Sequence, residues 1–326
     1  MNRVTPIVEL RDLSIVFPVS QGRDLYAVDG MTLAIEPGEV IGIVGESGSG
    51  KSVTAQAMLG LTVFNGGRIT KGQTIVDGRD VTDAKESTWR QVRGRTIGMV
   101  FQEPLSALNP LLSIGTQMKE AIERAPHLAG QSWRDTATRL LAEVQMHEPG
   151  LRVNQYPHEL SGGMRQRVTI AMALAQQPRL LVADEATTAL DVTVQREIVE
   201  LLLRLNQARG LAVVFISHDL ALVGEFCRRI IVMYGGRTVE EGPTDAVLGS
   251  PGHPYTELLL QARPSAAGIQ RDRRLVEIDG SVKPAYEPAR LCRFLDRCPV
   301  AMDTCRREPP PWRETQDQRA RCWREP

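Results

Sequence analysis

The sequence predicts an α/β fold with a parallel sheet at its centre. Apolar runs of strand length alternate with helix-like segments, and a glycine-rich loop stands between one fully apolar run and a helix. Strands separated by helices imply parallel βαβ units. A chain of 326 residues, 42% of them hydrophobic, can bury a substantial core, and its length allows one large domain with an appendage or two ordinary domains.

The N-terminal part is expected to begin with a β layer. Residues Ile7 to Phe17 and Met31 to Glu36 read as strands, and Val40 to Val44 as a buried strand. The glycine-rich loop then opens a helix at Lys51, and Ile97 to Phe101 is the next expected strand. The loop therefore lies where a buried strand passes into a helix.

A helix-rich stretch comes next and ends at about Ala175. It is punctuated by Pro104, Pro110, Pro126 and Pro149. We expect a helical subdomain here, at about residues 103–175, inserted into the α/β core. Alternation then returns, with strands expected at Arg179 to Asp184, Ala212 to Ser217 and Ile230 to Tyr234 and a helix at Thr193 to Gln207.

The chain changes character beyond about Arg263. Proline, arginine and cysteine accumulate there and the periodicity fades. We therefore predict two parts, an α/β domain over residues 1–262 and a loop-rich C-terminal extension over residues 263–326.

Composition excludes several classes of protein. Lys plus Arg and Asp plus Glu both total 39, so the formal net charge is zero and no nucleic-acid partner is expected. No apolar run approaches the roughly 18 residues that a membrane-spanning helix needs. The N-terminus lacks the uninterrupted apolar stretch of a signal peptide. We therefore expect a cytoplasmic chain that does not span a membrane by itself.

The glycine-rich loop fits the phosphate-binding pattern G-x-x-x-x-G-K-[ST] between a strand and a helix. Glycines let backbone N–H groups converge on phosphate oxygens, and the helix N-terminus adds a positive dipole end. Lys51 is expected to reach the β and γ phosphates of ATP, and the Ser52 hydroxyl to ligate Mg²⁺. The expected nucleotide-binding residues of the loop are Gly45, Ser47, Gly48, Gly50, Lys51 and Ser52. The sequence thus predicts a P-loop NTPase (RecA-like) core.

Two carboxylates end the apolar run Leu180 to Ala183. Asp184 is expected to hold Mg²⁺, and Glu185 to act as the general base that polarises the attacking water. Adjacent residues on an extended strand point to opposite faces, so the two carboxylates can take different roles.

The segment Leu160-Ser161-Gly162-Gly163-Met164-Arg165-Gln166, 24 residues before Asp184, resembles the signature of ABC ATPases. A Ser hydroxyl and an unhindered Gly N–H at a helix N-terminus suit phosphate binding. The resemblance implies that Ser161, Gly162 and Gly163 bind the γ-phosphate of ATP held by a second subunit. It also implies an N-terminal antiparallel β subdomain and the inserted helical subdomain.

Other elements of that family appear in the same order. Gln102 resembles the Q-loop glutamine that touches Mg²⁺ and the lytic water, and Asp191, after Ala189-Leu190, resembles the D-loop aspartate. His218 resembles the switch histidine that contacts the γ-phosphate. Tyr26, 19 residues before Gly45, resembles the aromatic residue that stacks on adenine. One departure is Ala186, where the family usually has Pro.

Two stretches resemble the ATPase subunits of peptide and nickel importers: Gln102 to Pro110 and Gly252 to Leu259. The resemblance implies a dipeptide or oligopeptide importer in which this chain works with a second, non-identical ATPase subunit. Two membrane-spanning permease subunits and an extracytoplasmic solute-binding protein would complete it, with the chain at the cytoplasmic face of the membrane. A nickel importer, and a soluble ATPase of the same family, are the alternatives.

Four of the five cysteines lie in the C-terminal extension, at Cys292, Cys298, Cys305 and Cys322. Disulfides are not favoured in a reducing cytoplasm. Four thiolates in a segment with little core suit a soft metal or an iron–sulfur cluster, whereas the spacing lacks the paired C-x-x-C of a zinc ribbon. The family resemblance implies a [4Fe–4S] cluster on these four residues, with Zn²⁺ second and disulfides or unligated thiols still open.

Overall fold

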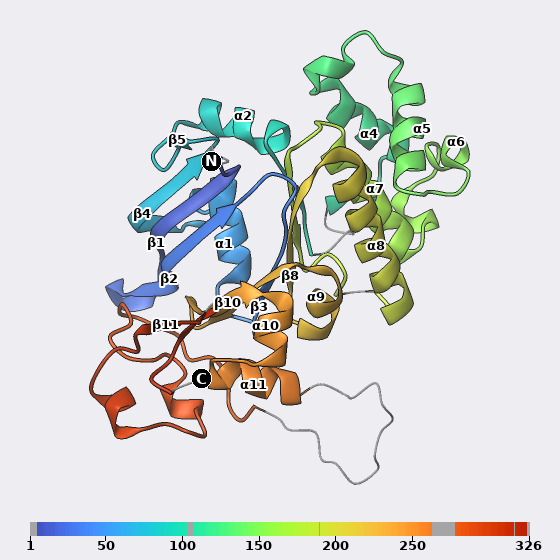
Figure 1. Cartoon of the computed structure of the whole chain (residues 1–326). Helices are drawn as coiled ribbons and strands as arrows, with labels where there is room; N and C mark the ends of the chain where they lie inside the picture. The colour runs from blue at the N-terminus through green and yellow to red at the C-terminus, as the bar shows by residue number, and fades with distance from the viewer. Residues whose placement is uncertain (1–4, 103–106, 189, 263–277, 316, 325–326) are drawn as a thin grey trace. The chain divides into compact units, whose positions relative to one another are not determined.

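The computed structural model describes residues 5–102, 107–188, 190–262, 278–315 and 317–324 (Figure 1). The chain divides into two units. The first comprises Met1–Ile7, Ile35–Glu39 and Asp83–Ile216, and the second comprises Val8–Ala34, Val40–Thr82 and Ser217–Pro326. Each unit is described by itself below.

The second unit contains an antiparallel layer in the strand order β2-β1-β4-β5. Its strands are β1 (Val8–Pro18), β2 (Asp24–Ile35), β4 (Arg68–Val76) and β5 (Arg79–Asp80). Strand β1 pairs with β4 in antiparallel register, and Leu10, Ile15 and Val28 are among the buried side chains of the layer. This layer is the expected N-terminal β subdomain, although β2 starts well before the predicted Met31.

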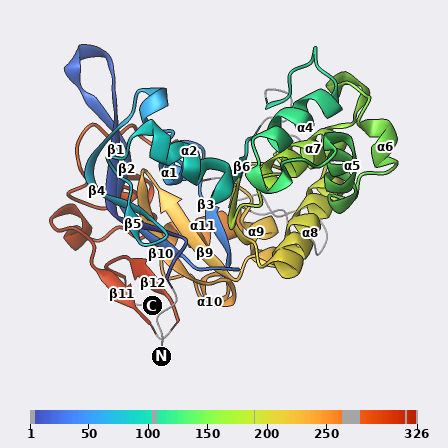
Figure 2. The same ribbon diagram turned by 90° about the horizontal axis from the view of Figure 1, so that it is seen from above.

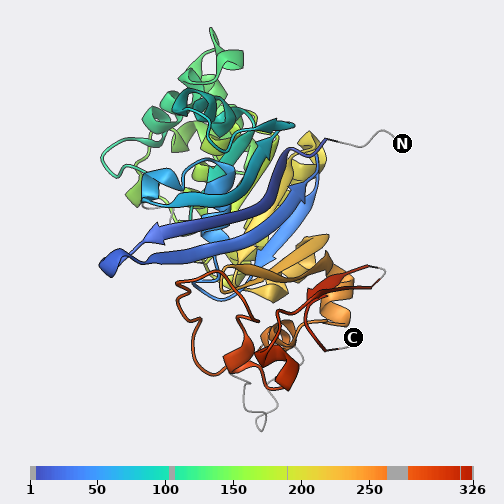
Figure 3. The ribbon, with the colours of Figure 1, turned by 90° about the vertical axis from the view of Figure 1, so that its left-hand side faces the viewer.

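The second sheet of this unit runs in the order β11-β12-β10-β9-β3. Its strands are β3 (Val40–Val44), β9 (Arg229–Tyr234), β10 (Arg237–Pro243), β11 (Trp312–Glu314) and β12 (Arg319–Arg321). Strands β3 and β9 are parallel and the others are antiparallel, so the C-terminal extension continues the sheet past β10. In Figure 3 the red β11 and β12 lie beside the orange β10.

Among the residues described in the second unit are four α-helices: α1 (Lys51–Met58), α9 (Leu220–Phe226), α10 (Thr244–Gly249) and α11 (Pro254–Gln261). Helix α9 packs on β3 at Gly42, where an added Cβ would lie 2.0 Å from Val223 Cγ1. Every residue of β3 is buried, which explains its uninterrupted apolar sequence.

The first unit is built on three parallel strands, β6 (Ile97–Val100), β7 (Leu180–Asp184) and β8 (Ala212–Ser217). Its helices are α2 (Glu86–Arg95), α4 (Ile114–Glu123), α5 (Trp133–Glu143), α6 (Pro149–Arg152), α7 (Gly162–Leu174) and α8 (Val192–Arg209). Helices α4, α5, α6 and α7 gather together in Figure 2. They form the helical subdomain inserted between β6 and β7.

The predicted fold class is confirmed, since parallel strands alternate with helices and a helical insertion follows β6. The strands expected at Arg179 to Asp184, Ala212 to Ser217 and Ile230 to Tyr234 match β7, β8 and β9 within a residue. The predicted domain boundary at residue 262 adjoins a range outside the described residues. The predicted start of the helical subdomain at about residue 103, with Pro104, falls in another such range. Across the part of the chain that the structure describes, no helix has both the length and the apolar character needed to cross a membrane.

Candidate nucleotide-binding site

The predicted phosphate loop connects β3 to α1 in the second unit. Gly45, Gly48 and Gly50 have φ values of 153°, 78° and 97°, which L side chains rarely adopt. A Cβ at Gly45 would lie 2.2 Å from the Met233 carbonyl oxygen, and one at Gly50 would lie 2.4 Å from that of Ala27. Both conformation and space therefore require glycine at these two positions.

The loop surrounds the side chain of Lys51, the first residue of α1. Lys51 Nζ donates to the carbonyl oxygens of Gly45 and Glu46 at 2.8 and 3.0 Å, and the side chain is buried. Ser52 follows in the first turn of the eight-residue helix, while Ser47 and Gly48 are exposed. The Lys51 ammonium group is therefore held by loop carbonyl oxygens at the N-terminus of α1.

A fit to phosphate is also indicated by Ser49. Its Oγ is buried and, among the residues described, has no hydrogen-bond partner. Gly236 N donates to the Ser49 carbonyl at 3.0 Å, which ties the loop to the turn after β9. A polar atom left unpaired beside a lysine and a helix N-terminus suits an anionic ligand.

Tyr26 and His218 belong to the same unit. Tyr26 lies in β2, and the carbonyl oxygen of the next residue, Ala27, is the atom that would contact a Cβ at Gly50. The Tyr26 segment is therefore beside the phosphate loop. His218 is exposed after β8, and Asp219 caps α9 by accepting from Ala221 N and Leu222 N at 2.8 and 3.1 Å.

The carboxylates lie at the end of β7 in the first unit. Asp184 is the last residue of the strand and is buried, while Glu185 has a left-handed φ of 47°. The expectation that both residues continue one extended strand was wrong, because the chain turns at Glu185. The turn is held by Glu185 N, which donates to Ile216 O at 3.0 Å.

Gln102 and Glu185 are brought together across 83 residues of sequence. Gln102 Nε2 donates to Glu185 Oε2 at 2.9 Å, and Thr188 Oγ1 is 3.4 Å from the same oxygen. The two residues that the sequence predicted to serve the lytic water are therefore neighbours.

The signature opens α7 of the first unit. Ser161 is its N-cap, and its Oγ accepts from Met164 N at 3.3 Å. A Cβ on Gly163 would lie 2.5 Å from Val194 Cγ1 in the first turn of α8. Asp191 caps α8 by accepting from Val194 N at 3.0 Å. The signature and the D-loop aspartate thus lie at adjoining helix N-termini, although Ala189 falls outside the described residues.

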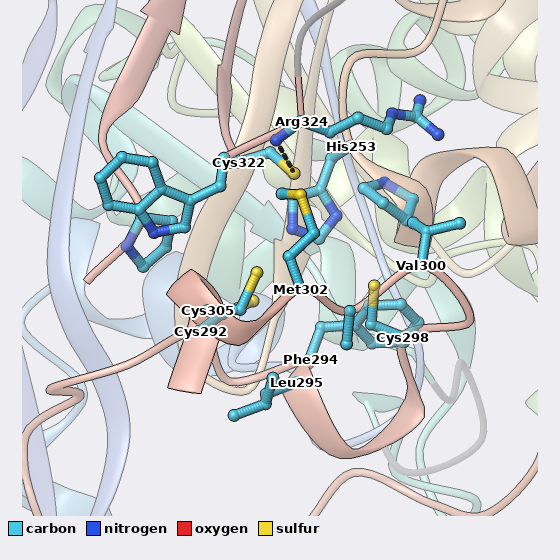
Figure 4. Close-up of a pocket in the computed structure, with 14 residues that line it drawn as sticks. His253, Cys292, Phe294, Leu295, Cys298, Val300, Met302, Cys305, Cys322 and Arg324 are labelled. Carbon is cyan, nitrogen blue, oxygen red and sulfur yellow. Dashed lines mark hydrogen bonds between the residues drawn. The ribbon is translucent and has the colours of Figure 1, made fainter. Parts of the chain in front are cut away.

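Figure 4 shows the four C-terminal cysteines around one cavity with His253, Phe294 and Met302. The cavity holds about 20 Å³, room for little more than one water molecule. Burial raises the pKa of Cys292 to about 11 and also raises the pKa of Cys298 and of Cys322.

Within the described ranges, no three His, Cys, Asp or Glu side chains are grouped so that they could hold a metal ion. The predicted [4Fe–4S] cluster on Cys292, Cys298, Cys305 and Cys322, and Zn²⁺ as its alternative, were therefore wrong. All five cysteines are free thiols, and burial raises the pKa of Cys227 to about 12. The four cysteines do line one cavity, but no three of them are grouped closely enough to share a metal ion, and the segment packs through Phe294 and through short strands instead.

Comparison with known families gives two matches along the chain. Residues 28–188 match the family described as ABC transporter, and residues 239–305 match the family described as oligopeptide/dipeptide transporter, C-terminal region. The structure resembles a dimeric post-hydrolysis state of the ATP-binding cassette MJ0796 bound to ADP and Pi. That match has a TM-score of 0.64 and 31% identity, over 73% of this chain and 98% of the other.

Curated relatives match over most of their length. The dipeptide transport ATP-binding protein DppD of Escherichia coli is 46% identical over 286 residues, 87% of this chain and 86% of its own. The oligopeptide transport ATP-binding protein OppD of Bacillus subtilis is 40% identical over 324 residues, 99% of this chain and 90% of its own. Neither name mentions an iron–sulfur cluster, in agreement with the geometry of the cysteine cavity. With these similarities, and with the phosphate loop, signature and carboxylates described above, the chain belongs to the ATP-binding subunits of ABC transporters, in the oligopeptide and dipeptide transporter family.

Proposed function

We propose that this chain hydrolyses ATP to drive the import of dipeptides or oligopeptides. The observation that carries the ATPase activity is the phosphate loop, whose glycine conformations and enclosed Lys51 make a cradle for phosphate groups. Peptide as cargo rests on the relatives, which are named for peptide and dipeptide transport and are similar over nearly the whole chain.

ATP would be the substrate. Its phosphates would bind the loop from Gly45 to Ser52, and Tyr26 would stack on adenine. Ser52, Gln102 and Asp184 would hold Mg²⁺, which neutralises charge on the phosphate oxygens when bound. The buried position of Asp184 suits a carboxylate that faces a cation.

Glu185 would act as the general base. Its carboxylate would take a proton from water as the water oxygen attacks the γ-phosphorus and the bond to the β–γ bridging oxygen breaks, giving ADP and phosphate. Gln102, 2.9 Å from Glu185 Oε2, would orient that carboxylate and the water, and His218 would contact the γ-phosphate. The left-handed φ of Glu185 is the kind of strain that active sites retain.

A second subunit would complete each nucleotide site. Ser161 and Gly162 are exposed at the start of α7, where their polar groups can meet a phosphate from outside the chain. The solved relative described above is dimeric. We propose that Ser161, Gly162, Gly163 and Asp191 serve the nucleotide bound by a second, non-identical ATPase subunit.

The membrane partners would be two permease subunits, reached from the cytoplasmic face and fed by an extracytoplasmic solute-binding protein. A pocket of about 780 Å³ in the first unit is lined by Arg90, Arg93, Arg95 and Arg124, with Glu86 and Gln176. Its excess of guanidinium groups suits an acidic segment of a permease.

The test is reconstitution of the complete transporter in liposomes with its solute-binding protein. Uptake of a labelled dipeptide that depends on ATP hydrolysis is the expected result. Uptake of Ni²⁺ in place of peptide would transfer the cargo to the nickel alternative. Hydrolysis by a chain that never associates with permease subunits would support a soluble ATPase instead.

A further inference from the structure

The C-terminal extension contacts the phosphate loop directly through Arg297. Arg297 Nη1 and Nη2 donate to the two carboxylate oxygens of Glu46, the second residue of the loop, at 2.8 and 3.2 Å. The Arg297 side chain is only 8% exposed and that of Glu46 24%. A bidentate pair of this kind fixes orientation as well as charge.

Arg297 is itself held rigidly. Its Nε and Nη2 donate to the carbonyl oxygens of Asp279, Ile278 and Gly280 at 2.7, 2.9 and 3.3 Å. Its guanidinium also lies 5.7 Å from the ring centroid of Tyr234. Because the donors are satisfied by the extension, the guanidinium presents a fixed fork to Glu46.

The backbone of Glu46 is held from the same side. Glu46 N donates to Tyr255 Oη at 2.8 Å, and Tyr255 is fully buried. The Tyr255 ring packs against Tyr234 and Phe294, with ring centroids 4.8 and 5.3 Å apart. The side chain and the main chain of Glu46 are therefore both held by residues that follow β10 in the chain, Arg297 and Tyr255.

The extension also contacts the strand that carries Tyr26. Tyr26 N donates to Ala285 O at 2.7 Å. Three residues along β2, Asp29 Oδ2 accepts from Ala289 N at 2.7 Å and from Arg293 Nη2 at 3.1 Å. Both elements expected to bind the nucleotide, the Tyr26 strand and the phosphate loop, thus contact residues 278–297.

We propose that residues 278–297 form a brace for the nucleotide site and that Arg297 is a positioning residue, which holds Glu46 and neutralises its charge so that ATP can bind. Glu46 places a carboxylate in a loop that receives a polyanion, and like charges repel across a partly desolvated site. This inference rests on the proposed function, because the loop must bind ATP for the brace to matter.

The test compares Arg297→Gln with Arg324→Gln in the full chain. Arg324 makes an equally close pair from the same extension, with Glu257, whose oxygens lie 2.9 and 2.5 Å from its nitrogens, but it does not contact the loop. We measure equilibrium binding of ATP, ADP and AMP with Mg²⁺ present, together with thermal unfolding. R297Q is expected to bind ATP roughly tenfold more weakly, with a smaller loss for ADP and the smallest for AMP. R324Q is expected to lower thermal stability with ATP affinity unchanged.

Removal of the unpaired carboxylate should reverse the defect. The double variant Glu46→Gln/Arg297→Gln is expected to bind ATP more tightly than R297Q alone. In R297Q, the turnover rate at saturating ATP should change less than the KM for ATP. If R297Q does not fold, Arg297→Lys, which keeps the charge and loses the fork, is expected to weaken ATP binding by roughly threefold.

Two results would overturn the brace. The first is wild-type ATP affinity in folded R297Q, or in R297K where R297Q does not fold; the second is an equal loss of ATP affinity in R297Q and R324Q. A wild-type chain that binds no ATP would instead refute the proposed function, so the two failures are distinguishable.

Discussion

Two features of Glu185 suit the role of general base that we propose for it. Its φ of 47° turns the chain away from β7, and Gln102 Nε2 at 2.9 Å fixes one carboxylate oxygen. Asp184, one residue earlier, stays buried at the strand end. The turn, rather than the alternation of a strand, separates the two carboxylates and lets them take different roles.

Glu185→Gln and Lys51→Ala should fail at different steps. Glu185→Gln keeps the hydrogen bond to Gln102 possible but cannot accept a proton, so hydrolysis should fall at least a hundredfold while ATP binding remains. Lys51→Ala removes the ammonium held by Gly45 O and Glu46 O and should lose ATP affinity itself. Binding and turnover are measured separately; wild-type turnover in Glu185→Gln would refute its assignment as base.

His253 makes stability depend on pH. Burial, with a smaller contribution from the charge of Arg324, lowers its pKa to about 3, and its Nδ1 accepts from Tyr255 N at 3.1 Å. Between pH 6.5 and 3 the unfolded chain binds a proton that the native chain does not. The free energy of unfolding should therefore fall as pH drops, by about 1.4 kcal/mol per pH unit for this group.

Denaturant unfolding at pH 7.5, 6.5, 5.5 and 4.5 measures this slope. The matched variant is His253→Asn, which can still cap α11 but does not titrate. Its baseline stability can differ, but its slope below pH 6.5 should be shallower than wild type by about that amount. Parallel curves for the two proteins would contradict the prediction.

Residues with a local motif could be predicted from sequence, and residues that act over long separations could not. Gly45, Lys51, Ser161 and Glu185 stand in short patterns, whereas Glu46 and Arg297 are 251 positions apart. Nothing near either residue indicates the other. The cysteine prediction was wrong for another reason, since four cysteines that are close in sequence line one cavity without being grouped as metal ligands.

Strand β3 shows what its sequence requires of its neighbours. Gly42 lies in the middle of the strand, and the missing side chain makes room for Val223 of α9. The close approach brings the helix down onto the strand that leads into the phosphate loop. Packing density at this contact therefore bears on both stability and the position of the loop.

Gly42→Ala should destabilise the chain. An added Cβ would lie 2.0 Å from Val223 Cγ1 and 3.3 Å from Cys227 Sγ, and overpacking of this kind costs about 1–3 kcal/mol. The matched control is Gly249→Ala at the end of α10, where no atom lies within 4 Å of an added Cβ. Denaturant unfolding should separate the two variants, and equal stability would show that α9 moves aside without cost.

The buried parallel strands were predictable, and the short strands of the extension were not. Strands β7 and β8 are apolar up to their last residues, Asp184 and Ser217, so their sequences predict burial on both faces. Strand β12 is Arg319-Ala320-Arg321, which has no strand signal of its own. Its pairing depends on β10 and on the ion pair of Arg319 with Glu241 at 2.7 Å, contacts that only the folded chain supplies.

At the scale of the whole molecule, the first unit exposes residues at the signature and next to Asp191. Ser161 is exposed at the signature, and Val192, next to Asp191, is 82% exposed. Val192 lies beside the N-termini of α7 and α8, the segment that we propose a second subunit contacts. The family resemblance implies that another subunit completes the nucleotide site, and we expect it to cover this surface.

The final prediction is that the partner is a non-identical ATPase subunit. Native mass spectrometry of the purified transporter should give one copy each of two different ATPase chains with two permease subunits, and two copies of this chain would contradict it.

Val192→Asp should lower ATP hydrolysis by the complex roughly tenfold, because a charge at the covered surface must be desolvated when the subunits close. The matched control is Val63→Asp in the second unit, where Val63 is 70% exposed in a short turn, Val63–Asn65, that contains no proposed site residue, so hydrolysis should stay at the wild-type rate. If both variants hydrolyse ATP as the wild type does, Val192 lies outside the subunit contact, and the completing surface must be sought elsewhere on the first unit.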